Sequence, residues 1–556
     1  MSFTITCPYC FRKMMDEEVL FRSEKVNLGE CDLIPDDYDD IDDFVARYNG
    51  ADKDSILTQY RDWEFFAETI DPVYEAFWEN FNGTTEFNPA DEILRVKAYR
   101  RRIIDPSDIS HRRYLKRQNG DDYFIRDDQG MVSQIELYTG EKCNRRVCKH
   151  CHNPLPDNYG KNTVKFVTVI GITGAGKTVY LSQLLQKMKT YAVKAGLSAV
   201  VTNASVRTFL EKNVIAAAEP LPGSTPATQL QQPLFYEMVR DAKEHGKITE
   251  TFVLFDVAGE VFKENSLINK FAPFVEHVDG VIVLIDPMQF EVVGGVANEG
   301  VTLDEPVVVL DAVQNIVTRG NVNEKCDIPF AVCISKADTE VVQRVLSDDL
   351  SAMLLDDVHG VKDTSGFNLP LFNAKEYNPI LNELYSFVQN NELVLAQQMQ
   401  TNYSRYAYFA FTALGCDVGT FKKFRDHEYE RIKKECKENK LRIPSQYVEI
   451  ENGEYPDMCF ESNSTGLVEY KCPIGPVLPK RVEEPLLWLF HKLGYIDVNE
   501  PIDDPSIPKV PCPQCGSIKT EDVPEDEREY TTGWGPFKKK HYINRRCECG
   551  YCWEHM

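Results

Sequence analysis

Short, continuous apolar runs dominate the sequence pattern between residues 161 and 495. They are rich in β-branched and aromatic side chains, they end at turn-forming residues, and they comprise Phe166–Ile170, Phe252–Phe255, Val281–Ile285, Phe330–Ile334 and Tyr408–Phe411. Runs of this length are typical of strands that are buried on both faces of a parallel sheet. Because amphipathic stretches separate the runs, the pattern predicts a doubly wound α/β domain.

The segments outside this domain have other patterns. Residues 11–147 are polar and acidic, with helix-like aromatic stretches such as Trp63–Phe81, and are predicted to form a mostly helical insertion. Within them, the acidic run Asp36–Asp43 is expected to be a solvated loop. The proline-rich, acidic residues 500–511 are predicted to link the α/β domain, residues 161–499, to a small module of residues 512–556.

Composition and charge narrow the class of protein. The chain has 556 residues, 43% of them hydrophobic, with 87 acidic and 62 basic residues and a formal net charge of −25. This charge argues against broad contact with nucleic-acid backbones or anionic membranes, although a local basic patch is compatible with it. The sequence has no apolar stretch of about 18 residues and no recognisable signal peptide, so we expect a soluble cytoplasmic protein.

Nine of the 17 cysteines lie in two short-spaced sets. Without an export signal, Cys-x-x-Cys pairs are typical of metal sites, because four thiolates satisfy tetrahedral Zn²⁺. A redox pair and unrelated surface cysteines are the alternatives. We therefore predict two structural zinc sites, the first from Cys7, Cys10, Cys148 and Cys151 and the second from Cys512, Cys515, Cys547, Cys549 and Cys552.

The two cysteine sets define predicted modules at both ends of the chain. The first set predicts an N-terminal zinc ribbon, residues 1–10 and 148–160, interrupted by the insertion. In the C-terminal ribbon five cysteines compete for four places: Gly550 favours Cys547 with Cys549, whereas standard spacing favours Cys549 with Cys552. Four histidines flank the cysteines and are expected to be exposed neighbours, not ligands: His150, His152, His541 and His555.

One loop matches a phosphate-binding motif completely. It follows the first strand candidate and precedes a helical stretch, Thr178–Lys194, with one apolar stripe. Glycines let backbone N–H groups surround phosphates, and the helix N-terminus adds positive partial charge. Lys177 is expected to reach the β- and γ-phosphates and Thr178 to ligate Mg²⁺; a glycine turn without a ligand is the alternative. The predicted cradle comprises Gly171, Thr173, Gly174, Ala175, Gly176, Lys177, Thr178 and Val179.

Three further strand ends carry candidate nucleotide-binding residues. After Phe252–Phe255, Asp256 can hold Mg²⁺ and Gly259 can offer its N–H group to a γ-phosphate. After Phe330–Ile334, Asp338 can accept two hydrogen bonds from guanine, a donor pair that adenine lacks, so this end favours GTP over ATP. The other residues predicted at the base are Ser335, Lys336, whose stem would lie along it, and the weaker set Thr412, Ala413 and Leu414.

The order of these motifs resembles that of the Ras-like (TRAFAC-type) P-loop GTPases over residues 161–495. With cysteine pairs at both ends and pieces such as Val19–Arg22, the chain is also similar to bacterial double-GTPase-type proteins associated with conflict and defence gene clusters. The resemblance implies a switch threonine before the strand candidate Pro233–Met238. Thr228 lies closer to that strand than Thr225 and is preferred, although both threonines fit an ordinary loop.

Two residues depart from the pattern of these GTPases. Glu260 stands where Ras-like enzymes carry a water-orienting glutamine, and its charge opposes the γ-phosphate. Ser335 replaces the usual asparagine, which implies a weaker brace to the P-loop. No arginine occurs from Glu211 to Met238, so no arginine finger in cis is evident. Slow or partner-assisted hydrolysis is the expected consequence.

These features predict a Mg²⁺-dependent GTP-binding switch that signals to a protein partner, with GTP or GDP, Mg²⁺ and two Zn²⁺ ions as cofactors. The alternatives are a non-hydrolysing nucleotide-binding scaffold or sensor, and a P-loop ATPase or kinase. Nucleic acid would have to bind through the C-terminal ribbon, whose basic residues are Lys538–Lys540, Arg545 and Arg546. Ras-like relatives often form nucleotide-dependent dimers, which leaves an oligomer open.

Overall fold

The computed structural model describes residues 3–35, 37–82, 98–120, 122–171, 174–201, 204–217, 220–222, 230, 232–242, 246–258, 261–262, 267, 270, 272–290, 293, 306–321, 323–355, 371–424, 434, 437–438, 467–504, 514, 520–522, 529–532, 539–542, 545–547 and 552–553. None of the helices in this part of the chain combines the length and the apolar content that crossing a bilayer requires.

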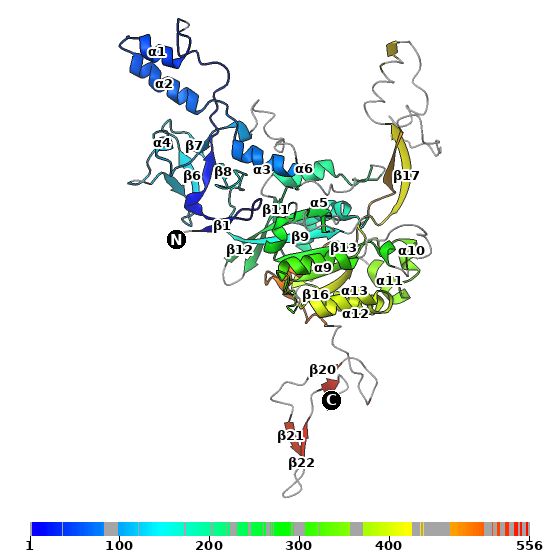
Figure 1. Ribbon diagram of the computed structural model, residues 1–556. Helices are drawn as coiled ribbons and strands as arrows, with labels where there is room; N and C mark the ends of the chain where they lie inside the picture. Colours follow the sequence, from blue (N-terminus) through cyan, green and yellow to red (C-terminus); the bar gives the residue numbers. More distant parts are fainter. Residues whose placement is uncertain are drawn as a thin grey trace.

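A seven-stranded sheet forms the centre of the molecule (Figure 1). Its strand order is β10 (Ser198–Val201), β11 (Leu234–Ala242), β12 (Gly246–Ala258), β9 (Thr163–Gly171), β13 (Gly280–Ile285), β14 (Phe330–Ile334) and β16 (Tyr406–Ala410). The last five of these strands pair in parallel, and each contains or overlaps one of the predicted apolar runs. The predicted α/β fold class is therefore confirmed.

The antiparallel edge of the sheet was not expected from the pattern. β11 pairs antiparallel with β12, and β10 pairs antiparallel with β11. β11 includes most of the strand candidate Pro233–Met238 and runs beyond it. β10 escaped prediction because only Ala199 of its four side chains is buried, as is common for a short edge strand.

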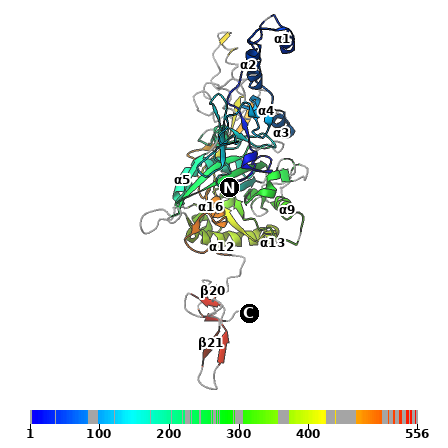
Figure 2. The ribbon, with the colours of Figure 1, turned by 90° about the vertical axis from the view of Figure 1, so that its left-hand side faces the viewer.

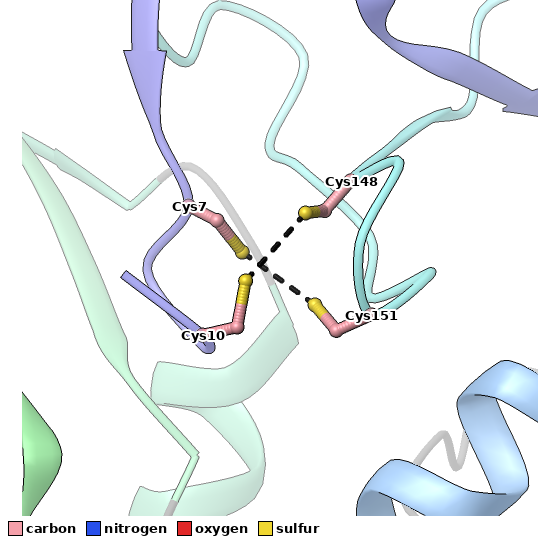
Figure 3. A group of neighbouring side chains, drawn as sticks. All are labelled: Cys7, Cys10, Cys148 and Cys151. Carbon is pink, nitrogen blue, oxygen red and sulfur yellow. Dashed lines mark hydrogen bonds between the residues drawn. The ribbon is translucent and has the colours of Figure 1, made fainter. Parts of the chain in front are cut away.

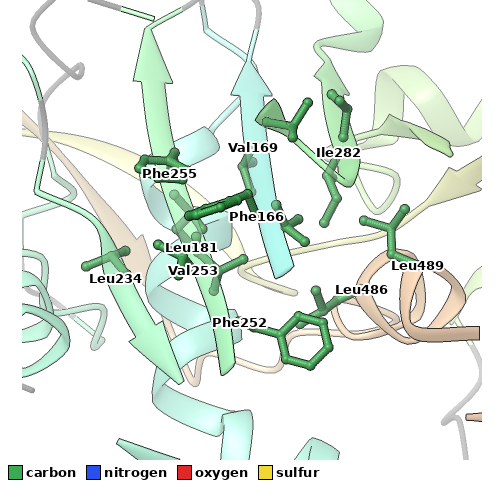
Figure 4. Packing of buried hydrophobic residues seen from close by; sticks show 14 of the residues in the cluster. Phe166, Val169, Leu181, Leu234, Phe252, Val253, Phe255, Ile282, Leu486 and Leu489 are labelled. Carbon is green, nitrogen blue, oxygen red and sulfur yellow. The ribbon is translucent and has the colours of Figure 1, made fainter. Parts of the chain in front are cut away.

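Helices cover both faces of the sheet, and Figure 2 shows α5 and α9 on opposite sides of it. They are α5 (Lys177–Lys194), α6 (Ala204–Lys212), α9 (Pro306–Val317), α10 (Glu340–Gln343), α11 (Asp348–Leu355), α12 (Ala374–Asn391), α13 (Leu393–Asn402) and α16 (Glu484–Lys492). The core under α16 is aromatic, since Phe252 of β12 and Phe490 have ring centroids 4.2 Å apart. Figure 4 shows Leu486 and Leu489 of α16 beside Phe252 and Ile282.

Three small sheets build the N-terminal module, and they extend the ribbon past its predicted boundaries at residues 10 and 148. Cysteine spacing marks the ligand loops but not the flanking strands, which are too short to show a pattern. The sheets are β1 (Thr4–Thr6) with β2 (Lys13–Met15); β3 (Leu20–Arg22) between β4 (Ile103–Ile104) and β8 (Arg146–Val147); and β6 (Val132–Glu136) between β5 (Phe124–Arg126) and β7 (Lys142–Cys143).

The helices of the insertion are α1 (Ile41–Arg47), α2 (Lys53–Phe65), α3 (Pro72–Asn82) and α4 (Ile109–Arg112). The acidic run is only partly the expected loop. Asp40 caps α1, its carboxylate accepting a hydrogen bond from the Asp43 N–H group (2.9 Å), because anions stabilise a helix N-terminus. The aromatic stretch Trp63–Phe81 is divided between α2 and α3 by residues 66–71.

The predicted linker is shorter than expected, because residues 500–504 dock onto α12. The Asn378 side chain donates to the Pro501 carbonyl (2.9 Å) and accepts from the Asp503 N–H group (3.0 Å). The remaining strands form small sheets: β15 (Leu371–Phe372) with β19 (Asp497–Val498), β17 (Asp417–Phe424) with β18 (Leu467–Ile474), β21 (Glu529–Thr532) with β22 (Lys539–Tyr542), and β23 (Arg545–Cys547) between β20 (Thr520–Asp522) and β24 (Cys552–Trp553).

Candidate nucleotide site and candidate metal centre

The phosphate-binding loop lies between β9 and α5 at the carboxyl edge of the parallel strands. Gly174 and Gly176 have φ angles of +82° and +75°, in the left-handed region that glycine adopts without a Cβ penalty. A Cβ on Gly171 would lie 2.7 Å from Cβ of Lys177, so the lysine stem crosses directly over this glycine. The local backbone therefore requires the glycines that the motif predicts.

The predicted phosphate lysine and metal carboxylate lie together. Lys177 begins α5, Asp256 lies near the end of β12, and the Lys177 ammonium forms an ion pair with the Asp256 carboxylate. Both side chains are less than one tenth exposed. β12 and β9 are adjacent parallel strands with Asp256 opposite Val169, which brings residues 79 positions apart to one point.

The Thr178 hydroxyl and the Asp256 carboxylate fit the oxygen ligands that Mg²⁺ prefers. Thr178 is half-buried in the first turn of α5, next to Lys177. The chemistry of these two side chains therefore suits a Mg²⁺ ion beside the phosphate-binding loop.

The predicted base-recognition residues also meet. The Ala337 N–H group donates to the Phe411 carbonyl (3.2 Å), which places the Ser335–Asp338 loop beside the Thr412–Leu414 loop. Thr412 in turn exchanges two backbone hydrogen bonds with Lys480 (3.1 and 2.9 Å). Asp338 is half-buried at this edge, and its charge adds to burial in raising the pKa of the Cys416 thiol.

Asp286 is a residue at this site that the sequence reasoning missed. It follows β13, is 8% exposed, and its carboxylate oxygen Oδ2 lies 2.7 Å from Nζ of Lys336. A Cβ on Gly174 would lie 3.2 Å from the same oxygen, so the carboxylate also lies against the phosphate-binding loop. A polar residue at the end of a buried parallel strand was the available signal.

Several predicted site residues lie outside the described part of the chain. In the nucleotide site these are Thr173, Thr228, Gly259 and Glu260. In the C-terminal cysteine set they are Cys512, Cys515 and Cys549, and for Cys547 only the backbone is described. Cys552 is described and half-buried in β24.

The four cysteines of the N-terminal set form one cluster, whose sulfurs point toward a common centre (Figure 3). Their Sγ atoms all lie within 4.8 Å of one another, with 3.6 Å from Cys7 to Cys151 and 3.7 Å from Cys10 to Cys148. Four sulfurs at a zinc–sulfur distance of about 2.3 Å in a tetrahedron are about 3.8 Å apart. The cluster therefore fits a Cys₄ zinc ion.

The surroundings of the cluster also suit bound thiolates. The N–H groups of Tyr9 and His150 donate to Sγ of Cys7 and Cys148 (3.4 and 3.3 Å). Burial raises the pKa of the Cys7 thiol, so a cation is needed to stabilise its thiolate form. Among the described residues, no histidine or carboxylate joins this group of four.

A buried ion network supports the second cysteine pair. Nδ1 of His152 lies 2.8 Å from Oδ1 of Asp71, and the Arg22 guanidinium donates to Oδ2 of Asp71 (2.6 Å). Burial acts to raise the pKa of Asp71, but its bonds to His152 and Arg22 outweigh burial and lower it. His152 is thus a neighbour of the cluster whose ring pairs with Asp71, but it is largely buried and not exposed as predicted.

Comparison with protein families matches residues 165–378 to the model described as Double-GTPase 2. The matched segment contains the P-loop, Asp256, Asp286 and the Ser335–Asp338 loop. The matched residues are thus similar to P-loop GTPases of the double-GTPase type. None of the curated proteins matches the chain.

Among solved structures, the chain is similar to Sup35 complexed with GMPPNP (13% identity, TM-score 0.19, 45% of this chain and 38% of that one). It is also similar to the signal recognition particle receptor SRb-GTP/SRX complex from Chaetomium thermophilum (16%, 0.22, 46% and 94%). A third is the Ski7 GTPase-like domain of S. cerevisiae, bound to GTP (12%, 0.24, 45% and 43%). The chain thus spans less than half of the Sup35 and Ski7 chains, and TM-scores of this size carry no conclusion about a shared fold.

Proposed function

We propose that the protein is a Mg²⁺-dependent GTP-binding switch with slow or partner-stimulated GTP hydrolysis. The proposal starts from the similarity of residues 165–378 to P-loop domains of the double-GTPase type. The observation that supports this best is the convergence of four distant motifs at one sheet edge. The P-loop follows β9, Asp256 lies near the end of β12, and the two predicted base loops follow β14 and β16. Ligands of open α/β sheets bind at this carboxyl edge.

The described site residues have roles that are compatible with their positions. Lys177 would neutralise the β- and γ-phosphates, and Thr178 and Asp256 would hold a Mg²⁺ ion, which would supply positive charge at the phosphates. Asp338 selects guanine by accepting from its two donors, and Lys336 lies along the base. Thr228, Gly259 and Glu260 are assigned to the γ-phosphate and the attacking water on the sequence alone.

The slow rate in this proposal rests on Glu260. A carboxylate can accept a hydrogen bond from the attacking water, but its negative charge opposes that of the γ-phosphate. A partner that supplies a cation would relieve this repulsion. The second candidate, a nucleotide sensor that does not hydrolyse GTP, follows from the same residue.

The output proposed for the switch is signalling to a protein partner, within a bacterial conflict, defence or regulatory system. The net charge of −25 disfavours nucleic acid and membrane as general partners. The zinc ribbons are proposed to be structural and to present the docking surface, with the Cys7–Cys151 cluster holding one Zn²⁺ ion and the C-terminal cysteines a second.

Nucleotide titration followed by multiple-turnover phosphate release tests this function. We expect the unmodified chain to bind GTP and GDP more tightly than ATP, and Lys177→Ala to weaken GTP binding about 100-fold through lost charge-assisted hydrogen bonds. Asp256→Ala should abolish Mg²⁺-dependent phosphate release. Lys165→Ala is the matched control, because Lys165 lies on β9 and pairs with Asp279 (3.4 Å) at the other end of the strand.

The outcomes separate the candidates. Equal affinity for ATP and GTP would favour the ATPase or kinase alternative. GTP binding without phosphate release would favour the non-hydrolysing sensor. Loss of phosphate release in Lys165→Ala as well would show that the assay reports folding and not the site.

A further inference from the structure

Asp286 connects three parts of the nucleotide site. Its Oδ2 atom accepts from the Lys336 ammonium (2.7 Å), and the same atom lies against Gly174 of the P-loop. Its Oδ1 atom accepts from the Met288 N–H group (3.0 Å), which fixes the carboxylate at the start of the turn after β13. The Asp286 side chain therefore lies against the predicted phosphate-binding loop and also contacts Lys336, the lysine predicted to lie along the base.

The backbone of Lys336 is held independently of Asp286. Both the N–H group and the hydroxyl of Ser335 donate to the Ile285 carbonyl (3.0 and 3.1 Å), one residue before Asp286. Lys336 itself has a φ of +54°, in the left-handed region that is uncommon for residues with a Cβ. Its backbone position is thus determined by β13 and β14, and only the long stem remains free to rotate.

The Asp286 carboxylate removes that freedom. A lysine stem loses considerable rotamer entropy when it is ordered, so a partner that orders it beforehand favours ligand binding. The ion pair also stabilises Asp286. Its side chain is 8% exposed, and a buried carboxylate is costly unless a cation and hydrogen bonds satisfy it. The Lys336 side chain is 40% exposed, which leaves part of it open to a base.

We propose that Asp286 is a positioning residue for guanine-nucleotide binding, which acts by ordering the Lys336 stem. This role rests on the proposed function, because it requires that Lys336 contacts a bound nucleotide. It goes beyond the sequence motifs, none of which includes residue 286.

The test is the affinity of the full chain for GDP, measured with a fluorescent GDP analogue. Asp286→Asn keeps the size of the side chain and an acceptor for the Met288 N–H group but removes the charge. We expect it to bind GDP about 10-fold more weakly, as for loss of one charge-assisted hydrogen bond. The matched control is Asp279→Asn at the opposite end of β13, where Asp279 accepts from the Phe166 N–H group (2.8 Å) and pairs with Lys165. This variant should bind GDP as the unmodified chain does.

Lys336→Met distinguishes positioning from a purely structural effect, since it keeps the stem and removes the ammonium. If Asp286 acts through Lys336, adding Asp286→Asn to Lys336→Met will cause little further loss of GDP affinity. An undiminished 10-fold loss in that background would overturn the proposal, and so would normal GDP binding by Asp286→Asn alone.

Melting temperatures complete the test. If Asp286→Asn lowers the melting temperature more than Asp279→Asn does, the Lys336→Met background still decides between the two roles, because a folding defect would persist there. A chain that binds no guanine nucleotide in its unmodified form overturns the proposed function and this role together. Normal GDP binding by both the unmodified chain and Asp286→Asn overturns only the role of Asp286.

Discussion

At the scale of a single residue, Asp338 is the side chain proposed to select the base. It lies in the loop after β14, which the Ala337–Phe411 hydrogen bond (3.2 Å) holds against the loop after β16. A carboxylate there can accept from two guanine donors, and no position on adenine offers the same pair. Selectivity should therefore depend on this one side chain.

Asp338→Asn is expected to weaken GTP binding about 100-fold, because an amide cannot accept both hydrogen bonds and carries no charge. ATP binding should remain as weak as before, so the ratio of the two affinities should fall toward one. Isothermal titration with each nucleotide measures this ratio. Asp348→Asn, on the exposed first turn of α11, is the control and should leave it unchanged.

Glu484 is a buried acid with a titration near neutrality. It begins α16, and the Arg481 guanidinium donates to its Oε1 atom (2.6 Å). Burial raises the pKa of Glu484 from an ordinary 4.5 to about 7, against the opposing effect of Arg481. Because the folded pKa is the higher one, the stability from this group is present below about pH 4.5 and is lost as the pH rises toward 7.

Glu484→Gln should remove this pH dependence, which amounts to a loss on the order of 3 kcal/mol in the unmodified chain. The melting temperature of the variant, relative to that of the unmodified chain, should therefore increase between about pH 5 and pH 8. Glu340→Gln removes an exposed partner of Arg344 and serves as the control. A difference that is flat with pH, or that falls, would contradict the assignment.

At the scale of elements, the segment that follows the Cys7–Cys10 pair packs onto β12, the strand that carries Asp256. Phe11 follows Cys10 directly, and its ring lies 5.9 Å from that of Phe166, 5.6 Å from Phe255 and 5.6 Å from His277. Phe255 immediately precedes Asp256 on β12. The N-terminal ribbon and the nucleotide domain thus share one aromatic cluster.

Phe11→Ala is expected to cost about 3–5 kcal/mol of stability, since it leaves a cavity in this cluster. Hydrogen exchange in peptides from β12 should become faster, because the cavity borders that strand. Phe44→Ala is a matched control: it removes an equally buried ring from α1, in the insertion, and should leave exchange in β12 unchanged. Equal effects of both variants on β12 would show that the ribbon has no special contact with it.

Local pattern predicted the strands better than their arrangement. Each of the five parallel strands contains or overlaps a short, largely apolar run because both faces of the sheet are buried there, and this signal is visible in the sequence alone. β10 and the short strands of the N-terminal module were not predicted, because short or half-exposed strands show no clear periodicity. Asp40 illustrates a different error, since the acidic run predicted a loop where a capped helix begins.

At the scale of the whole molecule, the zinc content distinguishes one metal site from two. The N-terminal cluster fits one Zn²⁺ ion. We predict two zinc equivalents in the full chain and one after removal of residues 505–556, measured by metal analysis of the purified protein. Cys148→Ser should lose one equivalent from the full chain, while Cys31→Ser, at a half-buried cysteine outside both sets, should lose none. A single equivalent in the full chain would exclude the C-terminal site.

The sequence by itself determined the candidate chemistry of the protein: the predicted phosphate loop, the carboxylate proposed to bind guanine and the cysteine pairs are all local patterns whose spacing defines their geometry. Only the tertiary structure showed which distant residues share a point in space. Asp286 with Lys336 and Gly174, and Phe11 with Phe255, meet because strand order and loop packing bring them together. Strand order is set by the burial of whole faces, a property of the assembled core that no local window of sequence contains.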